Sequence, residues 1–117
     1  MTDVFAGLLV SDREAAVRWW SAALGADPLM YPNDTEAVWQ VGEHAYVYVD
    51  AALDGRAPGQ GEVTLFLDEG TDLDERVTAM SGRGIAVSLR ETYDNGVRKV
   101  TFTDPDGNRL GLGAGSA

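Results

Sequence analysis

Acid–base catalysis is the first chemistry that individual side chains of this sequence could support. Glu62 is the candidate general base, because an apolar pocket raises the pKa of a carboxyl group toward the working pH. The single histidine, His44, or Tyr48 could act as the acid. Glu62 and His44 each have an explanation that involves no catalysis. Glu62 starts an expected strand, where surface carboxylates are common, and His44 lies beside a turn, where exposed histidines are common. The catalytic roles therefore remain unassigned.

The sequence gives little indication of a nucleophilic, phosphate-binding or cation-binding site. There is no cysteine, which excludes a disulfide, a thiolate metal site and a thiol nucleophile, and the lone histidine lacks the context of a catalytic triad. The glycines between 55 and 61 lack the strand–loop–helix setting and the lysine of a phosphate-binding loop. Asp104, Asp106 and Asn108 are spaced like cation ligands, but turn chemistry accounts for them without an ion.

Two helices and eight strands are expected to position these residues. The first helix begins at the capping-box pattern 11–14, with Ser11 as the cap, and ends near Leu24 before Gly25. The second begins at 71–74 and ends near Gly82 or Gly84. Apolar alternation and turn residues predict strands at about 3–10, 27–31, 36–41, 44–50, 62–68, 85–91, 97–103 and 109–113.

The same order of elements occurs twice along the chain. Asp12 and Asp72 open the two helices, and Gly25 and Gly84 close them, so a strand, a helix and three strands repeat. We predict one α+β domain over 1–117, with modules of about 1–50 and 62–113 and a linker at 51–61. The two sheets would enclose a groove, and ligand sites usually form where such halves meet.

Three features carry a resemblance to a known family. They are residues 10–12 leading into the paired tryptophans and Leu-Gly of 19–25, the internal repeat, and Phe-Thr-Asp-Pro-Asp-Gly-Asn at 102–108. The chain resembles the glyoxalase/bleomycin resistance/dioxygenase (vicinal oxygen chelate) superfamily. This resemblance implies two βαβββ modules that form a curved mixed sheet around a groove, and it implies a homodimer.

Metal-dependent members of that superfamily hold a divalent ion with His and Glu side chains from four strands. Carried over to this sequence, the four positions fall on Phe5, on Tyr46 or Tyr48, on Glu62 and on Gly111. A catalytic site needs about three protein ligands, and a single carboxylate does not hold a specific divalent ion. We therefore expect no metal and no other cofactor, which elemental analysis would test.

Strand alternation, interpreted with the resemblance, assigns a set of residues to the groove. Aromatic walls bind planar or cationic organic molecules by stacking and cation–π attraction, and Gly111 is expected to leave open space where a ligand of the ion stood. The predicted ligand-binding residues are Phe5, Trp39, Tyr46, Tyr48, Glu62, Phe66, Phe102, Arg109 and Gly111.

The net charge of −10 makes anionic partners unfavourable. A phosphate backbone or an anionic membrane surface is repelled by such a field, so neither a nucleic acid nor a membrane is expected, whereas a cationic small molecule is attracted. No apolar run is long enough for a signal peptide or a membrane span. The expected location is the cytoplasm.

The leading hypothesis is a metal-independent protein that binds a small aromatic or cationic compound, such as a drug or antibiotic sequestered in the manner of bleomycin-resistance proteins. One alternative is a metal-free lyase or isomerase acting on a small carbonyl compound. Another is a structural or regulatory homodimer without a ligand. A Glu62→Gln variant that binds but does not turn over would favour the enzyme.

Overall fold

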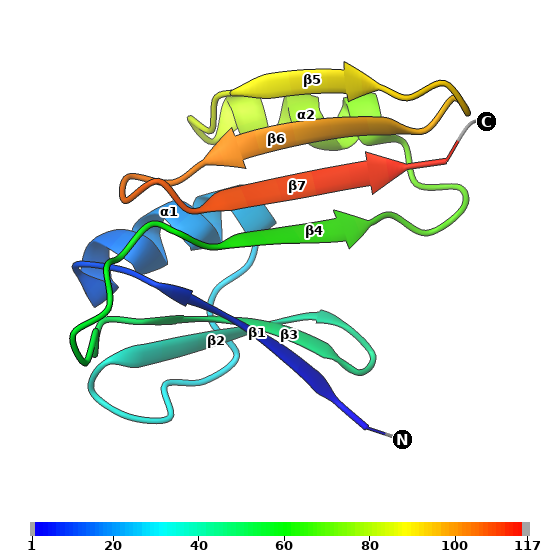
Figure 1. Ribbon diagram of the computed structural model, residues 1–117. Coiled ribbons are helices and arrows are strands. Elements are labelled where there is room, and N and C mark those ends of the chain that lie inside the picture. Colours follow the sequence, from blue (N-terminus) through cyan, green and yellow to red (C-terminus); the bar gives the residue numbers. More distant parts are fainter. Residues whose placement is uncertain (1, 116–117) are drawn as a thin grey trace.

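A computed structural model of the chain describes residues 2–115, so Met1 of the first predicted module lies outside the described part (Figure 1). Within this range the chain forms two helices and seven strands. They are β1 (Val4–Leu9), α1 (Arg13–Leu24), β2 (Glu36–Gly42), β3 (Ala45–Asp50), β4 (Glu62–Phe66), α2 (Leu73–Gly82), β5 (Leu89–Thr92), β6 (Arg98–Thr103) and β7 (Arg109–Ala114).

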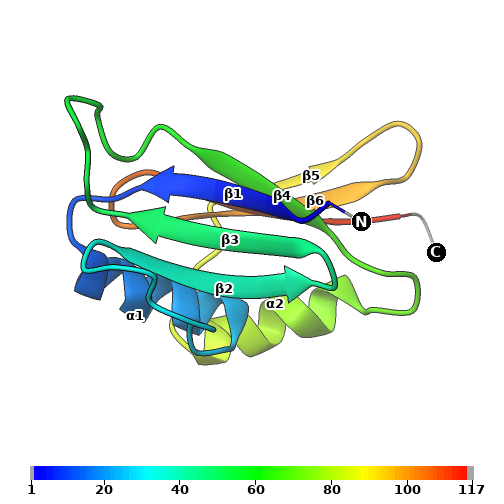
Figure 2. The ribbon, with the colours of Figure 1, turned by 90° about the horizontal axis from the view of Figure 1, so that it is seen from below.

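The strands form two mixed sheets in the described part of the chain. The first sheet has the order β1-β3-β2 and the second the order β4-β7-β6-β5. In each, the strand before the helix pairs in parallel with the last strand of its module, and the other pairs are antiparallel. Both helices cover the same side of the sheets (Figure 2). The predicted α+β architecture of two repeated modules is confirmed.

Two predicted strands are shorter than expected. The strand at 27–31 is reduced to a bridge between Met30 and Val38, because Pro28 lies within it and Pro32 follows it, and proline supplies no N–H for a ladder. The strand predicted from residue 85 starts at Leu89. Ile85 instead closes the end of α2, because its amide donates to the Met80 carbonyl oxygen at 3.0 Å.

The first helix is capped one residue later than predicted. Asp12, not Ser11, is the N-cap, and its carboxylate accepts from the amides of Glu14 and Ala15. Ser11 is engaged elsewhere: its hydroxyl donates to the carboxylate of Asp106 at 2.7 Å. Asp72 caps α2 in the same way by accepting from the Glu75 amide. The repeat of Asp12 and Asp72 therefore marks two real helix starts.

The core lies between the helices and the sheets. Helix α1 packs on β2 and β3 and touches α2, which packs on β7. The largest side chains that are fully buried there include Trp20, Trp39, Phe102 and Leu110. In the described residues, neither helix is both long and apolar enough to cross a membrane.

The turn at 104–108 joins the two modules. Buried Asp104 accepts from three amides of its own turn, and its other oxygen accepts from Trp20 Nε1 of α1 at 3.0 Å. Buried Asn108 donates to the Leu9 carbonyl at the end of β1 and accepts from the Gly61 amide just before β4. Hydrogen bonds of this turn, rather than an ion, explain why its Asp and Asn residues are spaced as they are.

Candidate functional site

The side of the sheets turned away from the helices is the candidate site, and we call it the open face. In the second sheet it consists of three rows of paired residues. The rows are Phe66, Gly113, Lys99 and Glu91; Thr64, Gly111, Thr101 and Leu89; and Glu62, Arg109 and Thr103. In the first sheet the pairs Phe5–Tyr46 and Gly7–Tyr48 lie on it. Tyr46 and Tyr48, the two residues between which the sequence left the fourth-strand position open, thus lie on the same face.

Two residues assigned to the groove lie on the opposite side, so their assignment is wrong. Trp39 is 1% exposed and Phe102 is 0% exposed, both within the core. Trp39 pairs with Val47, and Phe102 pairs with Leu110. Residues directly opposite in a ladder share a face, and both partners pack toward the helices. The indole N–H of Trp39 is satisfied there by the carbonyl oxygen of Ala26, at 3.1 Å.

Exposed aromatic rings form one part of the open face. Phe5 and Tyr46 stack with ring centroids 4.5 Å apart and an angle of 11° between planes, and Phe5 remains 49% exposed. Phe66, at the end of β4, is 62% exposed. Such large apolar surfaces in contact with water are the usual mark of an interaction site when they gather on one face.

Four charged side chains form the other part. Arg109 Nη2 lies 2.9 Å from the Glu62 carboxylate, and Lys99 Nζ lies 3.6 Å from it. The Lys99 side chain is only 18% exposed, whereas that of Arg109 is 52% exposed. We call Glu62, Lys99 and Arg109 the ionic trio. Glu91, the fourth charged residue, is paired with Lys99 in the ladder, so the trio's excess of one positive charge is balanced on this face.

The open space expected at Gly111 is absent, so that expectation is wrong. A Cβ at this position would lie 2.7 Å from Lys99 Cε and 2.9 Å from Thr64 Oγ1. Lys99 therefore crosses the glycine to reach Glu62. The same arrangement occurs twice more: Tyr48 lies across Gly7, and Phe66 lies across Gly113. A glycine lets a large neighbour lie flat on a sheet because it offers no side chain to displace it.

The residues at the expected metal positions do not fit a metal ion. Phe5, Tyr46, Tyr48 and Gly111 offer no carboxylate or imidazole, and the carboxylate of Glu62 is already paired with two cations. Among the described residues, no three His, Asp or Glu side chains gather as a metal centre. First-row divalent ions require such donors, so no chemistry is assigned to a metal here.

Two of the catalytic candidates, His44 and Glu62, are not brought together. His44 lies in the turn between β2 and β3, where its Nδ1 is 2.8 Å from Asp3 Oδ1. That turn lies near the N-terminus, whereas β4 begins with Glu62 at the opposite end of the sheets (Figures 1 and 2). His44 and Glu62 therefore do not form an acid–base pair. Tyr48 lies across Gly7 on the open face.

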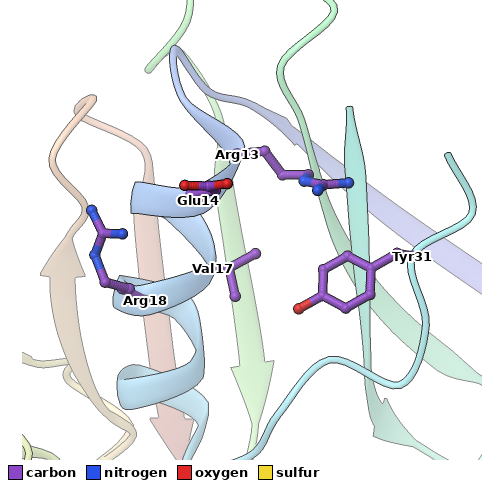
Figure 3. A pocket seen from close by; sticks show the side chains of 5 residues that line it. All are labelled: Arg13, Glu14, Val17, Arg18 and Tyr31. Atoms are coloured by element: carbon purple, nitrogen blue, oxygen red, sulfur yellow. The ribbon is translucent and has the colours of Figure 1, made fainter. Parts of the chain in front are cut away.

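Two surface hollows lie outside the centre of the open face: one is on the helix side, and the other begins at Phe66. One, of about 380 Å³, lies over the first turns of α1, with Val17 and Glu14 between Arg18 and Tyr31 (Figure 3). Arg13 also lines it, with its guanidinium 5.2 Å from the Tyr31 ring centroid. The other, of about 620 Å³, extends from Phe66 to the start of α2 and is lined by several carboxylates. We call it the acidic hollow.

Lys99 is the functional candidate that sequence reasoning missed. The sequence contained the necessary information. Along the strand 97–103, residues alternate between the two faces of the sheet, so Lys99 points to the face opposite that of Val100 and Phe102. If Phe102 faces the helices, Lys99 faces away from them. The error in placing Phe102 therefore hid the lysine as well, since neighbouring residues of a strand point to opposite faces.

Comparison with known proteins agrees with this architecture. A family model described as a glyoxalase-like domain matches residues 4–112. No curated protein matches the sequence significantly.

Solved structures with the same fold include close and distant sequences. A glyoxalase/bleomycin resistance protein from Catenulispora acidiphila is 40% identical with a TM-score of 0.86, covering 97% of this chain and 98% of its own. A member of the glyoxalase/bleomycin resistance protein/dioxygenase superfamily from Sphaerobacter thermophilus is 28% identical with a TM-score of 0.71, covering 97% of each chain. A lactoylglutathione lyase from Agrobacterium tumefaciens, 20% identical with a TM-score of 0.80 and coverage of 96% and 92%, shares the fold alone.

Proposed function

This chain belongs to the glyoxalase-like domain family, and from that premise we propose that it is a metal-independent binding protein for a small planar aromatic molecule. The open face is the proposed site. Sequestration of a drug or antibiotic is the proposed role, and the bleomycin-resistance name of the 40% identical structure supports it.

The exposed aromatic rings are the observation that carries this proposal. Phe5 stacks on Tyr46 yet keeps half of its surface free, and Phe66 is exposed on the same side of the second sheet. Offset stacking of a ligand ring contributes about 0.5–1.5 kcal/mol per contact beyond the burial of apolar area. Three available rings can thus bind a planar compound without any metal.

A homodimer is part of the proposal. Binding sites for small molecules usually bury about 70–90% of the ligand, and an open face by itself buries less. Val4 and Phe5 on β1 and Phe66 on β4 are exposed on the two strands that form the neighbouring edges of the sheets. A second copy would cover these edges. Light scattering on the purified chain should give twice its 12.5 kDa mass, and a monomer would remove any site shared between copies.

Ligand-observed NMR with a panel of glycopeptide, quinone and polycyclic antibiotics tests the binding. Tryptophan fluorescence is a poor reporter, because Trp20 and Trp39 are buried on the helix side. We expect saturation transfer to at least one planar compound, and we expect Phe5→Ser and Phe66→Ser to abolish it.

The matched control is Tyr31→Ser. Tyr31 is also an exposed ring, at 53%, but it lies in the hollow over α1. Its loss should leave the transfer unchanged. Absence of transfer across the whole panel, or equal loss in the Tyr31 variant, would contradict the proposal.

A further inference from the structure

We propose that the ligand of the open face carries an anionic oxygen group, a carboxylate in the simplest case, and that Lys99 and Arg109 bind it. This inference rests on the proposed function, because it names the charge of the same ligand. The ligand class then becomes an aromatic carboxylate rather than an aromatic cation.

The ionic trio has donors that Glu62 does not use. Arg109 gives one nitrogen to Glu62 at 2.9 Å, and a guanidinium has five N–H donors. Lys99 Nζ forms an ion pair with the Glu62 carboxylate at 3.6 Å, a distance longer than a hydrogen bond. Its N–H donors therefore make no hydrogen bond to Glu62, although the side chain is largely buried. A partly buried ammonium in so long an ion pair is a good partner for a second carboxylate.

Gly111 leaves room for the lysine stem on the sheet. Lys99 Cε would be only 2.7 Å from a Cβ at this position, so a larger residue there would require the lysine to move. In its present position the Lys99 side chain is only 18% exposed, which places its positive charge close to the sheet.

An exposed ring lies next to this charge. Lys99 pairs with Gly113 in the ladder between β6 and β7, and the ring of Phe66 covers Gly113, with its Cδ2 3.0 Å from where a Cβ would be. Phe66 and Lys99 thus belong to the same row of the open face, with Gly113 between them. A ligand whose ring contacts Phe66 can direct a carboxylate toward Lys99 and Arg109.

The overall negative charge of the chain does not oppose this binding strongly. Exposed charges farther away than the Debye length, about 8 Å at physiological ionic strength, are largely screened. Hydrogen bonds from two cations act at about 3 Å and are only weakly screened when partly buried. A cationic ligand would instead be drawn to the acidic hollow beside Phe66, which contains Asp68, Glu69 and Asp72.

Three probes that share one ring system distinguish an anionic, a neutral and a cationic ligand. 2-Naphthoate, 2-naphthamide and 2-naphthylmethylammonium differ in charge but offer the same surface for stacking. Titration of the full chain, followed by ¹⁵N chemical shifts, should show naphthoate binding about tenfold more tightly than naphthamide. Naphthamide binding equal to or tighter than naphthoate, or preference for the ammonium probe, would overturn the anion inference while leaving the proposed function intact. Failure of all three probes would overturn the proposed function and the inference together.

Variants test whether Lys99 and Arg109 cause the preference for naphthoate. Lys99→Met keeps an unbranched apolar stem over Gly111, and Arg109→Gln keeps a polar group; each should bring naphthoate affinity down to that of naphthamide. Arg90→Gln is the control, because it removes the same charge from β5, where Arg90 pairs with Val100 and so faces the helix side. An equal loss in the Arg90 variant would point to net charge and would contradict the inference. If Lys99→Met does not fold, Arg109→Gln alone carries the test.

Discussion

The two faces of the second sheet place the same kind of side chain in opposite surroundings. Phe102 on β6 is 0% exposed and packs toward the helices, whereas Phe66 on β4 is 62% exposed on the open face. The first contributes to the core and the second does not. The core and the proposed ligand contacts therefore lie on opposite faces of the same sheet, and single substitutions can separate them.

The parts of the open face that the first and second sheets contribute also differ from each other. In the first sheet an aromatic ring, Tyr48, lies across Gly7, while in the second a lysine stem lies across Gly111. The first sheet thus offers rings, and the second adds a partly buried positive charge in the same row as Phe66. A ligand that uses both must combine a planar part with a group that accepts hydrogen bonds.

Phe102→Ala is expected to have the largest effect on stability. Truncation of a fully buried phenylalanine costs about 3–5 kcal/mol, because a cavity remains where the ring was. Urea unfolding followed by circular dichroism would measure this loss. A decrease below 1 kcal/mol would mean that the ring is not part of the core and would remove the contrast between the two faces.

Asn108→Ala should have the next largest effect, about 2–4 kcal/mol. It removes the side chain that joins the modules and leaves the Gly61 amide and the Leu9 carbonyl without their partners, at about 1–3 kcal/mol for each buried group. Thermal unfolding measures the change. Asn95→Ala is the matched control, since exposed Asn95 accepts only from the Val97 amide of its own turn. Equal losses in the two variants would show that Asn108 does not join the modules.

Phe66→Ala should have the smallest effect on stability, within about 0.5 kcal/mol of the unchanged chain, as is usual for exposed positions. The same urea titration that measures Phe102→Ala compares the two phenylalanines directly. Binding of planar ligands should nevertheless be lost. A large destabilisation at every protein concentration would contradict the exposed position of Phe66. A loss that appears only at high protein concentration would come from the second copy of the proposed homodimer.

Local patterns predicted much of the fold. The aspartates that open both helices, the Asn95-Gly96 turn and the turn at 104–108 are short-range features, and each has the predicted location. The predicted strand at 27–31 failed because two prolines and a short length outweighed its apolar content. The cap of α1 moved from Ser11 to Asp12 because Ser11 bonds to Asp106, ninety-five residues away, which no local pattern reveals.

The order of elements, the repeat and the family were determined by the sequence itself, since turn chemistry, capping and alternation act over a few residues. The faces of Trp39 and Phe102, the filling of Gly111 by Lys99 and the pairing of Glu62 with two cations were decided only by the tertiary structure. Each depends on which strand lies beside which and in what register, and on how far a long side chain reaches across its neighbour. Those quantities follow from packing of the whole chain, so they cannot be obtained from one segment at a time.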